Sequence, residues 1–168
     1  MQKLNRSFFI RDVLKVAPDL LGKILVVKTS DSVIRTMITE VEAYRGEEDL
    51  ACHASKGRTP RTEIMYHEGG VIYVYLIYGM YWMLNFVTGM DQNPQAVLIR
   101  GTDGANGPGV LTRKLKIDGS FYGESLFNSE RIWLEPETTD HTIITRPRIG
   151  IDYAGEPWIS KPWRFLLS

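Results

Sequence analysis

Hydrophobic residues near the N-terminus are spaced as in an amphipathic helix. Residues 12–21 repeat apolar side chains every three or four positions, which predicts one or two short helices. Pro18 suits an early position in such a helix, and Gly22 suits the residue that caps its C-terminus. We therefore expect helical structure ahead of the first strand.

The next apolar runs have the composition of β-strands. Residues 24–27 and 33–41 are rich in β-branched side chains, and the polar stretch between them predicts a hairpin turn. Side chains two positions apart share one face of a strand. We therefore expect Glu40, Glu42 and Tyr44 to point the same way near the end of the second strand.

The middle of the chain combines a long polar loop with an aromatic hairpin. Residues 44–70 contain several glycines and no regular apolar pattern, and a loop of this length commonly carries function. Residues 71–78 and 81–87 predict an aromatic-rich β-hairpin that turns near Gly79. With a further strand at 96–99, they predict three consecutive antiparallel strands.

The last third of the chain has shorter elements. After a glycine-rich loop, residues 110–117 resemble a short helix with basic side chains on its outer face. Residues 131–134 and 142–149 predict two later strands. Because the sequence contains no internal repeat and no domain-sized linker, we expect residues 1–168 to form a single domain.

Composition narrows the class of protein. The chain has 168 residues and is 43% hydrophobic, which is enough to form a core without covalent cross-links. Its single cysteine, Cys52, rules out an internal disulfide. The longest apolar stretch, residues 71–87, is interrupted by Gly79 and Asn85, which is unsuited to a membrane span. The first six residues lack the apolar core of a signal peptide, so we expect a cytoplasmic protein.

Net charge gives no sign of a nucleic-acid partner. Twenty basic residues balance twenty acidic ones, whereas many nucleic-acid binders are strongly basic. The basic loop that contains Arg58 and Arg61 nevertheless favours local contact with phosphate. The alternative is that these are ordinary solubilising charges.

The residues alone suggest several sites, each with a simpler explanation. Glu40 and Glu42 could be solvated strand residues, or one could be buried, with a raised pKa suited to acid–base chemistry. A metal at His53 is weakly supported, because the other histidines show no ligand spacing with it. Tyr73 and Tyr75 suit packing between strands.

Ordered motifs along nearly the whole chain carry a resemblance to a known family. They are TEVEAY at 39–44, EDLACH at 48–53, RTPR at 58–61, YVYLIYGMY at 73–81, VLIR at 97–100, GPG at 107–109, and RIGI, AGE and KPWRF between 148 and 165. In this order and spacing they resemble the alkyladenine (3-methyladenine) DNA glycosylase family. The resemblance implies base-excision repair of alkylated or deaminated purines.

The resemblance assigns the hydrolytic chemistry to a small group of residues. Glu42 would be the general base that deprotonates a water aimed at the anomeric carbon of the sugar. Arg100 and the main-chain carbonyl of Ile149 would help to hold that water. Tyr44 and His53 would lie on opposite faces of a base flipped out of the duplex.

Further residues are assigned to DNA recognition by the same resemblance. Tyr78 would insert into the minor groove and fill the gap left by the flipped nucleotide. Asn85 would lie at the floor of the pocket and obstruct the exocyclic amino group of normal guanine. Arg58, Arg61 and Tyr81 are candidates for contact with the DNA backbone.

The resemblance also implies a fold and a partner. We expect a mixed α/β fold around a curved antiparallel sheet, with a protruding hairpin and short surrounding helices. The partner would be double-stranded DNA with damaged purines, bound by a monomer that has access to DNA, in the nucleus if the cell is eukaryotic. No metal or other cofactor is implied. Two alternatives are a lesion-binding module with little turnover and a hydrolase of small purine N-glycosides.

Overall fold

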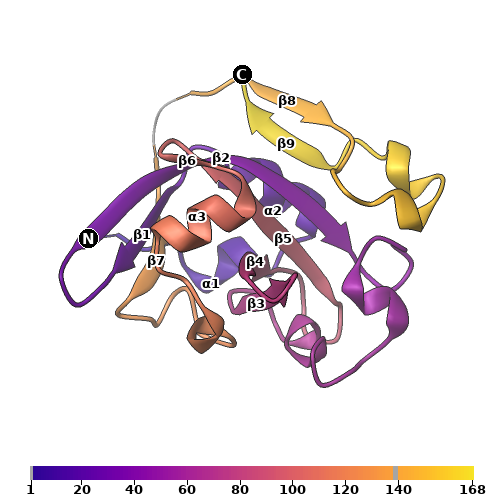
Figure 1. The fold of residues 1–168 in the computed structure, drawn as a ribbon, viewed down its shortest axis with the longest axis horizontal. Coiled ribbons are helices and arrows are strands. Elements are labelled where there is room, and N and C mark those ends of the chain that lie inside the picture. The colour runs from indigo at the N-terminus through magenta and orange to yellow at the C-terminus, as the bar shows by residue number, and fades with distance from the viewer. Residues whose placement is uncertain (1, 138–139) are drawn as a thin grey trace.

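The computed structural model describes residues 2–137 and 140–168, and across this part of the chain nine strands form one antiparallel sheet (Figure 1). The strands are β1 (Ile24–Lys28), β2 (Val33–Arg45), β3 (Ile72–Ile77), β4 (Tyr81–Val87), β5 (Gln95–Thr102), β6 (Ala105–Asn106), β7 (Ile132–Glu135), β8 (Ile143–Arg146) and β9 (Arg164–Leu167). The α-helices are α1 (Arg6–Phe9), α2 (Val13–Leu20) and α3 (Pro108–Lys114). Short 3-10 helices are η1 (His53–Lys56), η2 (Glu63–Tyr66), η3 (Gly119–Phe121), η4 (Asp152–Ala154) and η5 (Trp158–Ser160). The predicted mixed α/β fold is confirmed.

Strand β2 is the longest element and organises the sheet. The main strand order is β3-β4-β5-β2-β1-β7, and β6, β8 and β9 pair beside this path. The first half of β2 pairs with β1 and the second half with β5, and the register shifts between Ile38 and Val41. Residues Glu40 to Glu42 also pair with β9. This part of β2 is therefore an interior strand of the sheet, with pairing along both edges.

The predicted N-terminal helix is confirmed as α2. Its start is fixed by Asp12, whose side chain accepts a hydrogen bond of 2.8 Å from the Leu14 N–H. The apolar face of the helix is buried against the sheet, mainly on β2, as its 3.6-residue spacing requires. Pro18 was expected early in the helix, but it lies in the last turn because the cap sets the helix to begin at Val13.

The aromatic hairpin is confirmed and turns where predicted. Strands β3 and β4 pair from Ile72 with Phe86 to Ile77 with Tyr81. Between them, Tyr78 and Gly79 have φ angles of +50° and +65°, the left-handed backbone that a tight hairpin turn requires. The third strand, β5, continues the pairing from β4, as expected.

Elements in the second half of the chain agree with the prediction less closely. The expected helix at 110–117 begins earlier, at Pro108, because a proline fits the first turn after Gly107. The expected strand at 142–149 ends at Arg146, because Pro147 has no N–H to continue the pairing. No pattern in the sequence predicts α1, the two-residue strand β6 or the closing strand β9.

A continuous hydrophobic core joins both ends of the chain. It includes Phe9, the buried face of α2, the inner residues of β2 and β5, and Phe165 of β9. In the described part of the chain, no helix is long and apolar enough to span a membrane. The core therefore holds the second half of β2 between the N-terminal helix and the C-terminal strand.

Replacing Asp12 by alanine should destabilise the fold. The variant removes the cap of α2 and also the 2.8 Å ion pair between Asp12 and Arg45 at the end of β2. The expected loss is about 1–2 kcal/mol in the free energy of unfolding, measured by urea denaturation. Asp31→Ala, in the exposed turn between β1 and β2, is the control. An Asp12→Ala loss no larger than that of the control would contradict the capping role.

Candidate functional site

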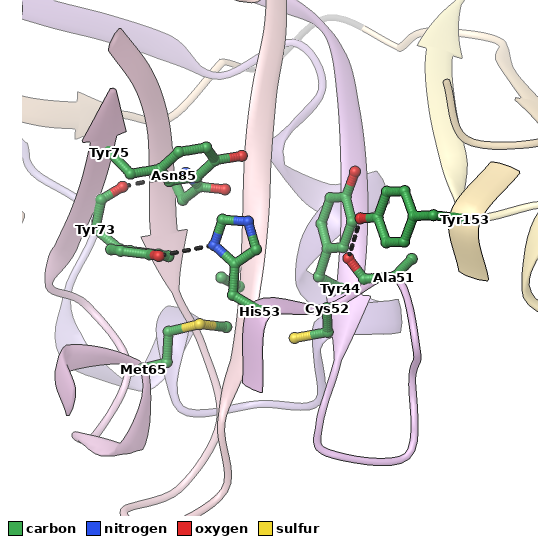
Figure 2. A pocket seen from close by; sticks show the side chains of 10 residues that line it. Tyr44, Ala51, Cys52, His53, Met65, Tyr73, Tyr75, Asn85 and Tyr153 are labelled. Carbon is green, nitrogen blue, oxygen red and sulfur yellow. Dashed lines mark hydrogen bonds between the residues drawn. The ribbon is translucent and has the colours of Figure 1, made fainter. Parts of the chain in front are cut away.

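A small cavity of about 50 Å³ opens beside the end of β2. Its walls come from β2, from the loop that enters η1, from β3 and β4, and from the η4 turn (Figure 2). The lining residues are Tyr44, Ala51, Cys52, His53, Met65, Tyr73, Tyr75, Asn85, Ala96 and Tyr153. This volume is well below the range of about 300–1,000 Å³ found for small-molecule sites, so the lining side chains enclose only a narrow space.

The ionisable groups on the cavity wall are held in their neutral forms. Burial raises the pKa of the Cys52 thiol to about 12 and that of the Tyr73 hydroxyl to about 12. Burial also lowers the pKa of His53 to about 4, and the nearby Arg61 and Lys56 charges add to this shift. The cavity therefore presents aromatic rings and uncharged polar atoms at neutral pH.

Hydrogen bonds and ring contacts fix the side chains on one side of the cavity. Figure 2 shows His53 lying between the Tyr44 ring and the group formed by Tyr73, Tyr75 and Asn85. His53 Nδ1 and the Tyr73 hydroxyl are hydrogen-bonded at 2.8 Å, and the His53 and Tyr75 rings meet edge to face at 4.6 Å between centroids. Asn85 is buried, and its Nδ2 donates to the Tyr73 carbonyl at 3.2 Å. These contacts hold the predicted pocket residues His53 and Asn85 on the wall of one cavity.

Glu42 has no solvent exposure and lies behind the Tyr44 side of the cavity. Its Oε1 accepts a hydrogen bond of 2.9 Å from the Tyr44 hydroxyl, and its Oε2 accepts one of 2.6 Å from the Ile149 N–H. Arg100 Nη1 lies 3.5 Å from Oε1. The structure thus places Arg100 and Ile149 at Glu42, although the contact from Ile149 is made by its N–H rather than by its carbonyl.

Burial raises the pKa of Glu42 above its ordinary value, because water no longer solvates the charge. The Arg100 charge, the Ile149 N–H and the Tyr44 hydroxyl oppose this shift by stabilising the carboxylate. A carboxylate with a raised pKa is a stronger base than a solvated one. Its environment therefore suits Glu42 to remove a proton from a weak acid such as water.

The contacts of the neighbouring side chains agree with the predicted strand face. Glu40 and Glu42 both approach Arg100, at 3.4 Å and 3.5 Å, and Tyr44 donates to Glu42. Glu40 also accepts from Arg164 of β9 at 3.1 Å. Solvent exposure, the usual state of a strand glutamate, does not apply to Glu42, because Tyr44, Arg100 and the Ile149 backbone contact its carboxylate.

Comparison with known proteins identifies the family. The family model described as Methylpurine-DNA glycosylase matches residues 7–104 and 101–168. Similar proteins bear the name "Putative 3-methyladenine DNA glycosylase". Those of Psychrobacter cryohalolentis, Legionella pneumophila (strain Corby) and Desulfitobacterium hafniense are 43%, 44% and 41% identical to this chain. The alignments cover 94%, 100% and 100% of this chain and 87%, 96% and 96% of the relatives.

This protein belongs to the methylpurine-DNA glycosylase family. The resemblance stated from the motifs is thereby confirmed. The matches extend from the N-terminal helices to β9, so they include every strand and loop that contributes to the cavity. The cavity and Glu42 are therefore features of a methylpurine-DNA glycosylase family member.

In this family member, Tyr78 lies at the tip of the β3–β4 hairpin. The side chain is 87% exposed, which is unusual for a tyrosine, and the three-residue turn at 78–80 carries it away from the sheet. Met80, in the same turn, is also exposed. The hairpin therefore presents two large apolar side chains to solvent on a rigid support.

The three candidates for DNA-backbone contact differ in their surroundings. Arg58 is held by Glu63, with 2.6 Å from its Nε to the carboxylate, and by Gln92. The Arg61 guanidinium lies 5.0 Å from the centroid of the Tyr75 ring at the edge of the cavity. Tyr81 begins β4, and Arg113 lies 5.8 Å from its ring centroid. The Arg58 charge is thus already paired, which makes Arg61 the better phosphate-binding candidate.

Sequence reasoning missed several residues that build the site. Tyr73 and Tyr75 are predicted to pack between strands, but both side chains line the cavity. Tyr153 also lines the cavity, and its hydroxyl donates to the Ala51 carbonyl at 3.0 Å. Asp49 and Arg148 form a fully buried ion pair at 2.6 Å behind Tyr44. The alternation of tyrosines in the hairpin could have indicated Tyr75, whereas the other contacts join residues about a hundred positions apart.

The described residues do not form the cluster of ligands that a metal centre requires. Within residues 2–137 and 140–168, no group of three His, Cys, Asp or Glu side chains could hold a metal ion. Cys52 is buried and unpaired by any disulfide. His53, next to it in sequence, is engaged by Tyr73.

Tyr44→Phe should raise the pKa of Glu42 further. The variant keeps the ring in the cavity wall but removes the hydroxyl that stabilises the charged carboxylate. The measurement is a carbon-13 NMR titration of the Glu42 carboxyl in both proteins. Tyr66→Phe is the matched control, because it removes a 2.6 Å hydrogen bond to Glu47, outside the site. A Glu42 pKa that is unchanged or lower in Tyr44→Phe would show that the hydroxyl does not stabilise the carboxylate.

Proposed function

We propose that this protein is a DNA glycosylase that flips alkylated or deaminated purines out of the duplex and hydrolyses their bond to the sugar. The observation that carries the proposal is the pairing of a neutral aromatic cavity with a buried carboxylate, joined by the hydrogen bond from Tyr44 to Glu42. The family, and the name of its relatives, support the same activity. The class of substrate is 3-methyladenine, hypoxanthine and ethenoadenine in DNA.

Glu42 is the general base in this proposal. Its carboxylate takes a proton from a water molecule, and the oxygen of that water forms a bond to the anomeric carbon of the sugar. The N-glycosidic bond breaks, and its electron pair leaves with the base. Arg100 keeps a positive charge beside the carboxylate before the proton is taken. The products are a free base and an abasic site in an intact strand.

A lysine nucleophile would change this outcome, because a Schiff base with the sugar leads to strand cleavage. The cavity is lined by no lysine among the described residues. Lys56, in η1, lies on the outer extension of the cavity beside Arg61. Hydrolysis by water, with no cleavage of the strand, is therefore the reaction that the lining supports.

In this proposal, side chains of the cavity wall retain the flipped base and select damaged bases over normal ones. The Tyr44 and His53 rings both line the cavity and lie next to one another in Figure 2, and the proposal has a flipped purine stack between them. Extrusion from the duplex costs a few kcal/mol, and stacking between rings offsets part of that cost. Asn85 is fixed by carbonyls of β3 and β4, and in this proposal its side chain obstructs the exocyclic amino group of normal guanine. Selection then comes from shape and from the weaker bond of a damaged base.

The hairpin and the edge of the cavity supply the contact with DNA. Tyr78 is the wedge that fills the gap left by the flipped nucleotide, because it projects from the surface on a rigid turn. Arg61 stands at the cavity edge, where a phosphate beside the flipped nucleotide would lie. Neither role requires a strongly basic protein, which agrees with the net charge of zero.

Glu42→Gln should abolish excision while leaving lesion binding intact. The amide cannot accept the proton from water, so the single-turnover rate should fall about 10²–10⁴-fold. The assay is release of base from duplexes that carry 3-methyladenine, hypoxanthine or ethenoadenine, followed by cleavage at abasic sites. Glu135→Gln is the matched control, because Glu135 is also buried and held by an arginine, on β7.

The same experiment separates the alternatives. Tight lesion binding without excision in the folded wild-type protein would favour a lesion-binding module. Release of base from free purine nucleosides, with none from DNA, would favour a hydrolase of small N-glycosides. Failure of the wild type to release any of the three bases from DNA would refute the proposed activity.

Tyr78→Ala should weaken the flipping of a paired base. Without the ring, the gap in the duplex stays unfilled, and excision from double-stranded DNA should fall about 10- to 100-fold. Excision from single-stranded DNA should change less, because no partner base has to be replaced. Met90→Ala removes another exposed apolar side chain, away from the hairpin, and serves as the control. Equal losses on both substrates would contradict the wedge.

A further inference from the structure

A buried ion pair lies behind the cavity without lining it. Arg148 Nη1 and Nη2 donate to the two oxygens of Asp49 at 2.6 Å and 2.9 Å, and neither side chain has any solvent exposure. Both residues are absent from the cavity wall. The pair therefore acts on the site only through the residues that it holds.

Arg148 connects the pair to the proposed general base. Its Nη1 also donates to the Ala43 carbonyl at 3.0 Å, between Glu42 and Tyr44 on β2. Its guanidinium lies 4.9 Å from the centroid of the Tyr44 ring. The next residue, Ile149, donates its N–H to Glu42. One arginine thus ties the loop after β8 to both functional side chains of β2.

Asp49 connects the pair to the opposite wall of the cavity. Its Oδ2 accepts from the Arg45 N–H at 3.0 Å, and its Oδ1 accepts from the Ala51 N–H at 3.1 Å. These bonds shape the turn that leads from the end of β2 to Cys52 and His53 in the lining. The carboxylate therefore has four donors, two from Arg148 and two from the backbone.

Stability alone is a poor explanation for such a pair. Removing two charges from water costs free energy, and apolar residues of similar volume often replace a buried ion pair without loss of stability. An ion pair instead constrains orientation, because a guanidinium can donate to both oxygens of a carboxylate only over a narrow range of relative orientations. Here the directed contacts lead to Glu42, to Tyr44 and to the loop of His53.

We propose that Asp49 and Arg148 are positioning residues, whose ion pair holds the Ile149 N–H on Glu42 and the Tyr44 ring in the cavity wall. The inference rests on the proposed function, because its purpose is the alignment of Glu42 with a flipped nucleotide. The pair contacts neither the base nor the water. Its effect on the reaction is exerted through the geometry of the side chains that do.

The test uses two variants that change the pair with little change in size. Arg148→Lys keeps the charge and loses the fork that binds both oxygens, and Asp49→Asn keeps the shape and loses the charge. Glu135→Gln alters the pair with Arg35 at the far end of β2 and is the matched control. Three quantities are measured: the single-turnover excision rate, the Kd for a lesion-free duplex, and hydrogen exchange of the Ile149 amide without DNA.

The expected result separates positioning from binding. In Arg148→Lys, excision should slow about 100-fold, because a misplacement of about 1 Å is sufficient for such a loss. The Kd for the lesion-free duplex should stay unchanged, since the wedge and Arg61 lie elsewhere. The Ile149 amide should exchange about tenfold faster or more, as its acceptor is no longer held in place. Asp49→Asn should change the same quantities in the same direction, and Glu135→Gln should change none of them.

Each other outcome has a definite meaning. An Ile149 amide that exchanges at the wild-type rate in both folded variants would overturn the positioning role, whatever the excision rate. If both variants unfold while the control folds, the pair determines the fold rather than the site, and the proposal is overturned as well. If the wild type does not excise any base, the proposed function fails, but the exchange measurement still decides whether the pair holds Ile149 on Glu42.

Discussion

Burying the Glu42 carboxylate costs free energy, and the fold offsets this cost with donors from separate parts of the chain. The Tyr44 hydroxyl comes from the same strand, the Arg100 charge from β5, and the Ile149 N–H from the loop after β8. Unpaired, the charge would be expelled or neutralised. The Glu42 side chain therefore contacts both β5, through Arg100, and the loop beyond Pro147, through Ile149.

The cavity beside this carboxylate has a different electrostatic character. Its own ionisable groups are neutral, while the charges of Asp49, Arg148 and Arg100 lie outside the lining. A neutral aromatic wall suits a heterocycle that arrives without its partner base. In the proposed reaction, Glu42 and Arg100 would face the sugar, where charge is created and removed. The Tyr44 ring would then separate the binding of the base from the chemistry at the sugar.

Local pattern predicted much of the fold and part of the site. The spacing of apolar residues indicated α2, the first strands and the aromatic hairpin, because each is determined by neighbours in sequence. Periodicity also placed Glu40, Glu42 and Tyr44 on one face. It could not reveal the burial of Glu42, whose carboxylate contacts the distant Arg100 and Ile149, or the Asp49–Arg148 contact across 99 positions. The motifs named the family, but these distances came only from the folded chain.

The position of Ile149 has a consequence for the order of events during synthesis. The N–H that completes the Glu42 environment comes from the C-terminal part of the chain, held in place by Arg148 and by pairing with β9. Contacts between distant segments form late in folding, and a chain still on the ribosome has not yet made them. The β3–β4 hairpin can therefore form before Glu42 receives its hydrogen bond from the Ile149 N–H. The surroundings of Glu42 are therefore complete only when the last strands of the sheet have formed.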